Sequence, residues 1–198
     1  SIKVIGYGAE PMPASTLKML REAFLNVELR QTYGMIELGV LRAKSKDDSS
    51  LWVKLGGEGY DLSVVDGVLQ VKAEAAMLGY LNAPSPITPD GYFITGDMVE
   101  QDGEYLKILG RSSDLINVGG QKVYPAEVET VLLQIEGVVD ASVFGEKHPL
   151  LGKIVCATIV AAESADQDEL RKRIKRECAE KLQRFMVPAR INITTGSL

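Results

Sequence analysis

The segment from residue 110 to residue 129, GRSSDLINVGGQKVYPAEVE, constrains the fold of this chain more than any other stretch. Gly119 and Gly120 stand side by side, and paired glycines let the backbone turn where a side chain would clash. Residues 121–124 after them are typical of a short extended segment. Pro125 suits the first turn of a helix, which we expect to run to residue 135. The segment therefore predicts a tight turn followed closely by a helix.

Two further motifs lie upstream. Residues 92–98, YFITGDM, form a β-type run that ends in Gly96 and Asp97, which predicts a carboxylate at the exit of a strand. Residues 31–37, QTYGMIE, follow a predicted strand over residues 27–30. Tyr33 offers a flat ring for a purine, and Glu37 offers hard oxygen atoms for Mg²⁺. Taken singly, Tyr33 also fits a core aromatic residue, Glu37 a solvated surface acid and Asp97 a turn residue.

Together, in this order, these three motifs resemble those of the adenylate-forming (AMP-binding) superfamily. This superfamily contains acyl-CoA and aryl-CoA synthetases, peptide-synthetase adenylation domains and luciferases. The resemblance covers essentially the whole chain and implies the C-terminal part of an acyl-CoA synthetase-like enzyme. The implied fold is α+β and α/β. Residues 1–111 are the end of the large AMP-binding domain, with strands, a helix and a small β-barrel. Residues 112–115 are a hinge, and residues 116–198 are a small mobile α/β domain with a three-stranded sheet and two helices.

The resemblance also implies roles for individual residues. Asp97 accepts hydrogen bonds from both ribose hydroxyls, Arg111 reaches the nucleotide, and the turn over residues 6–11 runs along the adenine. An ordinary strand-to-helix turn is the alternative for that last stretch. The nucleotide-binding residues implied are Gly8, Ala9, Glu10, Thr32, Tyr33, Gly34, Asp97 and Arg111. Asp114 corresponds to the hinge, Gly119, Gly120 and Lys122 to the CoA site, and Glu37 to the metal ligand.

The implied reaction is the two-step work of an AMP-forming acid–CoA ligase using ATP, Mg²⁺ and CoA. A carboxylic acid attacks the α-phosphate of ATP, and a thiol then takes the acyl group. We expect no catalytic residue within the chain, because the lysine that activates the acid belongs after Leu198 and the phosphate-wrapping loop before Ser1. The chain is thus expected to be inactive alone and to be a piece of a longer protein.

Two alternatives stand beside the CoA ligase. Residues 118–120 and 124–129 look like the CoA-ligase branch, whereas peptide-synthetase relatives that load a carrier-protein thiol more often carry a different version. The family also usually has Thr or Ser where this chain has Ile36, and isoleucine cannot hold a phosphate. That departure supports a degenerate domain that only binds a nucleotide or a partner. The identity of the acid is not readable from these residues.

Apolar periodicity predicts the remaining elements. Residues 2–5 form a strand, and Ser15 or Thr16 caps the helix after it. Residues 44–50 form an exposed loop, and residues 52–55, 60–65 and 68–72 alternate as antiparallel strands, with Asp66 and Gly67 turning between the last two. Residues 138–144, 154–160 and 189–194 are predicted strands. Residues 166–184 are a predicted helix whose core stripe is Leu170, Ile174, Cys178 and Leu182.

Charge and composition exclude several classes. The formal net charge of −5 argues against a protein that coats nucleic acid, and the basic run over residues 171–176 is best interpreted as the solvated face of a helix. No apolar run approaches the roughly 20 residues of a membrane span, and no signal peptide opens the chain. Cys156 and Cys178 are expected to be reduced thiols that act as small buried hydrophobic residues, as in a cytoplasmic protein. His148, the one histidine, falls in a predicted turn without an identifiable catalytic partner.

Overall fold

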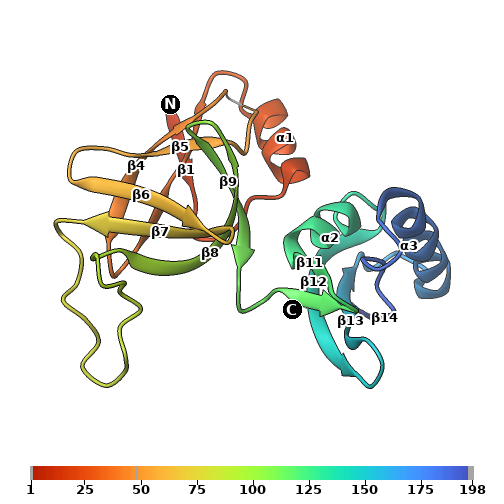
Figure 1. Ribbon diagram of the computed structural model, residues 1–198. Coiled ribbons are helices and arrows are strands. Elements are labelled where there is room, and N and C mark those ends of the chain that lie inside the picture. Colours follow the sequence, from red (N-terminus) through yellow and green to blue (C-terminus); the bar gives the residue numbers. More distant parts are fainter. Residues whose placement is uncertain (1, 48, 196–198) are drawn as a thin grey trace. The chain divides into compact units, whose positions relative to one another are not determined.

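The structure, a computed structural model, describes residues 2–47 and 49–195. Ser1 and Leu198, which end the two predicted domains, and Asp48 in the predicted loop over residues 44–50 lie outside the described residues. The chain divides into two compact units, Ser1–Ser112 and Ser113–Leu198 (Figure 1). Among the described residues, every helix is too short or too polar to cross a membrane.

The first unit opens with two parallel strands, β1 (Val4–Tyr7) and β2 (Glu28–Gln31), joined through helix α1 (Ala14–Ala23). The strand lies two residues later than predicted, so Gly6 and Tyr7 belong to the strand and the turn starts at Gly8. The predicted cap is wrong, because α1 begins after Pro13 and Ser15 lies inside the helix. The hydroxyl of Ser15 is buried and has no hydrogen-bond partner among the described residues.

A seven-stranded antiparallel sheet fills the rest of unit 1, in the order β3-β4-β5-β9-β8-β7-β6. Its strands are β3 (Tyr33–Met35), β4 (Gly39–Ser45), β5 (Val53–Gly56), β6 (Tyr60–Val65), β7 (Val68–Ala73), β8 (Phe93–Asp102) and β9 (Tyr105–Arg111). Asp66 and Gly67 form the predicted β6–β7 turn, with φ of 53° and 80°. Strand β4 includes residues 44 and 45, so the predicted loop starts later. The core of the sheet is built from buried leucine, valine and phenylalanine side chains.

Strand β8 is longer than predicted, and this corrects the position of Asp97. The strand continues to Asp102, so Asp97 lies within it and not at its exit. The sequence suggested an end because Gly96 and Asp97 follow the β-type run. In the structure Gly96 has a φ of 76°, and the pairing of β8 with β9 shifts register between Met98 and Val99. This irregularity turns the strand locally without ending it, since β8 pairs with β7 and β9 along its length.

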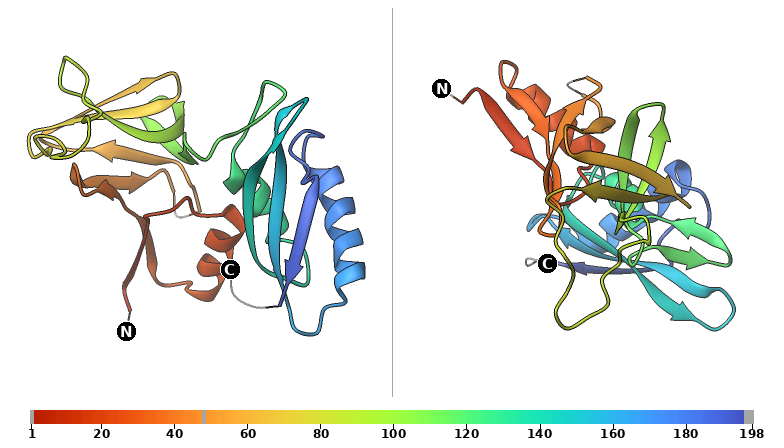
Figure 2. Two further views of the ribbon diagram at one scale, coloured as in Figure 1. Left: turned by 90° about the horizontal axis from the view of Figure 1, so that it is seen from below. Right: turned by 60° about the vertical axis from the view of Figure 1, so that its left-hand side comes forward.

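Unit 2 is a five-stranded sheet with two helices. Strands β11 (Gln121–Val123), β10 (Ile116–Val118), β13 (Gly152–Ala161) and β12 (Val138–His148) follow one another, and β14 (Arg190–Thr194) pairs in parallel with β13. The three predicted strands are therefore extended by the short β10–β11 hairpin. Helices α2 (Pro125–Leu132) and α3 (Gln167–Lys181) supply buried side chains to a core shared with the sheet, and α3 runs along one face of it (Figure 2).

Both helices of unit 2 end earlier than predicted. Helix α2 stops at Leu132, three residues before the expected end, and a turn leads into β12. Helix α3 is capped by Asp166, whose side chain accepts from the N–H groups of Asp168 and Glu169. Leu170, Ile174 and Cys178 are buried as predicted, while Leu182 is the C-cap residue and only partly buried. Both cysteines are free thiols buried in the unit.

Candidate functional site

Three side chains from separate motifs meet in unit 1 at Asp97. Asp97 is buried, with 7% of the residue exposed. The Tyr33 hydroxyl donates to Oδ2 at 2.6 Å, and the Arg111 Nε lies 3.0 Å from Oδ1. These residues come from β3, β8 and β9, and Tyr33 is 64 positions from Asp97 in the sequence. The fold thus gathers three of the predicted nucleotide-binding residues into one cluster, which we call the Asp97 cluster.

Thr95 supports this cluster and was not among the predicted site residues. It is 4% exposed, and its hydroxyl donates to the carbonyl oxygen of Leu69 at 2.7 Å. The Thr95 hydroxyl oxygen also accepts the N–H of Asp97 at 3.0 Å, and Arg111 Nη1 donates to the Thr95 carbonyl oxygen at 2.7 Å. Because the buried Thr95 hydroxyl both donates and accepts a hydrogen bond, it fixes the backbone of Asp97 relative to β7. The sequence feature that could have identified Thr95 as a supporting residue is its position two residues before Asp97.

The electrostatics of the cluster keep Tyr33 protonated. Burial raises the pKa of the Tyr33 hydroxyl, and the negative charge of Asp97 raises it further. The hydroxyl is therefore a hydrogen-bond donor at every physiological pH. Its ring also packs against the apolar core of unit 1, so the core-aromatic interpretation accounts for part of its surface. The ring of Tyr33 consequently contacts the core of unit 1, while its hydroxyl belongs to the Asp97 cluster.

The glycine turn after β1 lies directly against Thr32, the residue between β2 and β3. The Thr32 N–H donates to the Tyr7 carbonyl at 2.7 Å, and its hydroxyl donates to the same oxygen at 3.1 Å. A Cβ on Gly8 would lie 2.4 Å from Thr32 Oγ1 and 2.6 Å from the Thr32 carbonyl oxygen, so only glycine fits. Ala9 has a φ of 71°, and Glu10 is exposed.

Gly34 and Glu37 lie at the β3–β4 hairpin. A Cβ on Gly34 would lie 2.7 Å from the Gly39 carbonyl oxygen, which again requires glycine. The Glu37 carboxylate accepts a hydrogen bond from the Tyr80 hydroxyl at 2.6 Å, and this bond lowers the pKa of Glu37. Glu37 is thus an ionised, partly exposed carboxylate held by a residue 43 positions away. Ile36 beside it is fully exposed.

In unit 2, the predicted CoA-binding residues form the β10–β11 hairpin. Gly119 and Gly120 have φ of 57° and 90°, as a two-residue turn of this kind requires. The Gly120 N–H donates to the Asn117 side chain at 2.8 Å, and Lys122 is exposed. Asp114 is also exposed and accepts from the Ser113 hydroxyl at 2.9 Å, next to the boundary between the two units. Its hinge role stays a prediction.

His148 is the last residue of β12 and not part of a turn, which corrects its predicted placement. Its Nδ1 accepts the backbone N–H groups of Leu150 and Leu151, both at 3.3 Å. The described residues contain no group of three or more histidine, cysteine or acidic side chains that could enclose a metal ion.

Comparison with known proteins places this geometry in a family context. Residues 127–197 match the family model described as the AMP-binding enzyme C-terminal domain. The chain is 33% identical to the 2-succinylbenzoate–CoA ligase of Geobacillus kaustophilus, over 93% of the chain and 40% of that protein. It is 30% identical to a long-chain-fatty-acid–CoA ligase of Mycobacterium tuberculosis, over 93% of the chain and 39% of that protein.

Solved structures of other proteins superpose on nearly the whole chain. The ATP-bound MatB of Rhodopseudomonas palustris superposes with a TM-score of 0.83 at 27% identity, over 98% of this chain and 42% of that one. The amide bond synthetase McbA of Marinactinospora thermotolerans superposes with a TM-score of 0.80 at 27% identity, over 98% of this chain and 43% of that one. The chain spans about two fifths of the length of the curated relatives it matches.

Proposed function

Because the chain belongs to the adenylate-forming (AMP-binding) superfamily, we propose that the protein containing it is an ATP-dependent, AMP-forming acid–CoA ligase. The Asp97 cluster is the single observation that carries this proposal, since it unites residues of three separate motifs around one buried carboxylate. The curated relatives named as CoA ligases support the choice of reaction.

The ribose of ATP binds at Asp97 in this proposal. Each carboxylate oxygen has a second lone pair beyond the bond to Tyr33 or the contact with Arg111, so both can accept a ribose hydroxyl. Arg111 contacts the carboxylate through Nε and adds positive charge beside the phosphates. The purine is lined by the turn at Gly8, Ala9 and Glu10 and by Thr32 and Gly34. Tyr33 forms one wall of this purine site.

Mg²⁺ fits at Glu37 as an ion that arrives with ATP. The carboxylate is ionised and oriented by Tyr80, and one protein carboxylate with phosphate oxygens is a usual environment for this ion. Bound there, the ion would neutralise charge that builds on the phosphates during the reaction. Ile36 offers no hydroxyl to the phosphates, so we assign their remaining contacts to other parts of the protein.

The chemistry runs in two steps. An oxygen of the substrate carboxylate attacks the α-phosphorus of ATP, and pyrophosphate leaves with the electrons of the broken P–O bond. The thiol sulfur of CoA then attacks the acyl carbon, loses its proton, and displaces AMP. We assign Asp114 to a hinge between the two steps and Gly119, Gly120 and Lys122 to the CoA side of the second. The acid is a small-molecule carboxylic acid, and the acceptor is CoA in preference to a carrier protein.

Exchange of labelled pyrophosphate into ATP, measured with the full-length protein over acids from acetate to long-chain and aryl acids, tests this function. We expect exchange with one class of acid, and acyl-CoA formation once CoA is added. Transfer to a holo-carrier protein and not to CoA would show the carrier-loading alternative. Absence of exchange with every acid, from folded protein that contains the lysine and phosphate loop, would support a degenerate binding domain and make Ile36→Thr the first variant to examine.

A further inference from the structure

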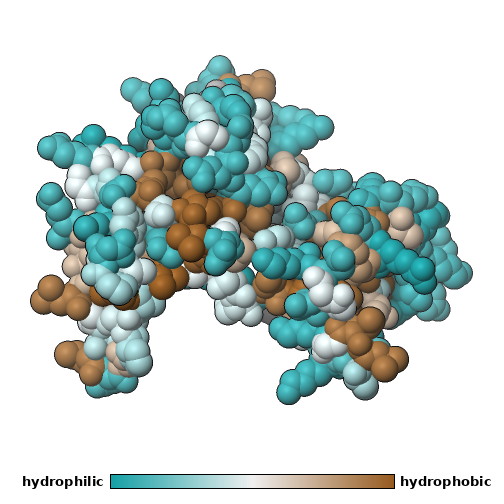
Figure 3. All heavy atoms as spheres, viewed as in Figure 1, coloured by the Kyte–Doolittle hydropathy of each residue, from teal (hydrophilic) through white to brown (hydrophobic). Residues whose placement is uncertain are grey.

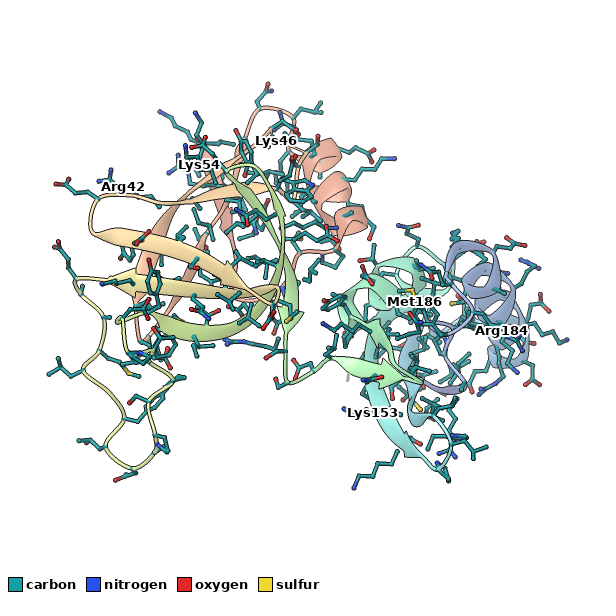
Figure 4. The ribbon with its side chains drawn as sticks, in the orientation of Figure 1. Arg42, Lys46, Lys54, Lys153, Arg184 and Met186 are labelled. Atoms are coloured by element: carbon teal, nitrogen blue, oxygen red, sulfur yellow. The ribbon has the colours of Figure 1, made fainter. Side chains whose placement is uncertain are left out.

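Two lysines at the β12–β13 turn of unit 2 are not explained by the fold. Lys147 and Lys153 stand directly opposite each other in the β12–β13 ladder. Like charges in this arrangement repel and weaken the pairing of the strands. Within residues 2–47 and 49–195, neither ammonium forms an ion pair. In unit 1, by contrast, Lys46 and Lys54 pair with Asp102 at 3.0 Å and Glu104 at 2.8 Å (Figure 4 labels both lysines and Lys153).

The two lysines line a groove that is large enough for a small molecule. The groove has a volume of 770 Å³ and lies entirely within unit 2. Sites for small molecules commonly measure about 300–1,000 Å³. Besides the two lysines, its walls include Asn117, His148 and Leu151, so it combines apolar surface with cationic and polar groups. Hydrophobic residues, brown in Figure 3, are visible at the surface of this unit. We call this feature the Lys147–Lys153 groove.

The groove is built into the sheet. The stem of Lys153 packs across β12, because a Cβ on Gly145 would lie 3.0 Å from its Cδ. His148 accepts two backbone N–H groups at Nδ1, so the neutral ring carries its proton on Nε2 and adds a donor to the lining. The Leu151 carbonyl oxygen accepts the N–H of Gly119 at 2.8 Å. That bond fixes the groove to the hairpin for which we propose contact with CoA.

We propose that the Lys147–Lys153 groove binds the phosphate groups of CoA. The inference rests on the proposed function, because it names the part of the thiol substrate that this unit recognises. Lysine ammonium groups bind phosphate as point charges, and a bound polyanion converts their mutual repulsion into attraction. The apolar surface of Leu151 leads from the lysines to Gly119, which gives the less polar pantetheine arm a path toward the hairpin.

Kinetics of the full-length protein test this proposal with the double variant Lys147→Gln/Lys153→Gln. We expect the KM for CoA to rise about tenfold, with kcat unchanged, because two charge-assisted phosphate contacts are lost. The KM for pantetheine, which has the thiol and no phosphate, should stay the same, and so should pyrophosphate exchange. The matched control Lys46→Gln/Lys54→Gln removes the same charge from unit 1 and should leave all three values unchanged.

An unchanged KM for CoA in the Lys147→Gln/Lys153→Gln protein would overturn the proposal, and so would an equal rise for CoA and pantetheine. Titration calorimetry with the 198-residue chain separates this outcome from failure of the proposed function. CoA should bind in a salt-dependent manner, about tenfold more weakly to the double variant, whether or not the whole protein forms an adenylate. Absence of CoA binding, or binding of an acidic holo-carrier protein in its place, would refute the groove assignment.

Discussion

The Asp97 cluster and the Lys147–Lys153 groove handle charge in opposite ways. In the cluster, Asp97 is nearly buried, and Tyr33, Arg111 and Thr95 each make a defined contact with its carboxylate or backbone. In the groove, two cations face each other across a strand pair with no counter-ion among the described residues. The cluster pairs the charge of Asp97 with groups of its own unit, and we expect these contacts to stabilise unit 1. The groove gains its balancing charge only from what binds there.

Replacement of Asp97 should give the largest effect. Asp97→Ala leaves the Tyr33 hydroxyl without its acceptor and removes the contact of Arg111 Nε, so we expect unit 1 to lose about 2 kcal/mol of unfolding free energy. Urea denaturation monitored by Tyr and Trp fluorescence measures the loss. Asp102→Ala, which breaks an exposed pair with Lys46, should change the free energy by less than about 1 kcal/mol. Equal effects of the two variants would show that the cluster adds nothing beyond a surface pair.

The glycine at the turn should rank next. Gly8→Ala places a Cβ against the Thr32 carbonyl and hydroxyl oxygens, and relief of this clash should cost on the order of 1 kcal/mol. ATP affinity of the full-length protein should fall as well, because the turn lines the proposed purine site. Gly6→Ala is the matched control, since its Cβ would meet only the Arg30 carbonyl oxygen at 4.0 Å. A Gly8→Ala protein as stable as Gly6→Ala would contradict the close approach of these two segments.

Alkaline pH should weaken unit 2 through Cys178. Burial raises the pKa of this thiol to about 11, whereas the unfolded chain ionises near the ordinary value. Between these values the unfolded state binds fewer protons, so stability is full below about pH 9 and falls on the order of 1 kcal/mol as pH rises toward 11. Chemical denaturation from pH 8 to pH 11 measures this slope, and Cys178→Ala should reduce it. A slope that survives in Cys178→Ala would assign it to other groups.

Charge reversal in the groove should act on stability with the opposite sign from Asp97→Ala. Lys147→Glu replaces a repulsive cross-strand pair with an attractive one opposite Lys153, so we expect a gain of about 0.2–1 kcal/mol in the unfolding free energy of unit 2. Thermal denaturation of the 198-residue chain measures the gain. A loss of stability would mean that the two ammonium groups already have a favourable environment, and the contrast with the Asp97 cluster would disappear.

The smallest effect should come from Tyr80→Phe. Loss of the hydroxyl removes the donor that lowers the pKa of Glu37, so that pKa should rise toward the ordinary glutamate value. Nuclear magnetic resonance titration of the side-chain carboxyl carbon detects the shift, and the fold should be unaffected. The same titration of Glu10, an exposed acid, is the reference. A Glu37 pKa that does not move would show that the 2.6 Å bond is not maintained in solution.

Sequence reasoning succeeded where local chemistry decides the structure. The paired glycines at 119 and 120 predicted a tight turn, Asp66 and Gly67 predicted a hairpin, and the helical repeat predicted the buried face of α3. It failed at Asp97 and at Ser15. Gly96 looked like the end of a strand, but pairing with β7 and β9 carries β8 through it. Ser15 looked like a cap, but the helix begins after Pro13.

The sequence alone determined which residues bear the family motifs, the turns and the apolar faces, because these depend on residue type and short spacing. Only the tertiary structure decided that Tyr33 donates to Asp97, that Thr95 supports both Asp97 and Arg111, and that Tyr80 holds Glu37. It also decided that Lys147 faces Lys153, a pairing set by the register of β12 and β13. Such contacts join residues through strand order and register, and no local pattern in a single sequence encodes these.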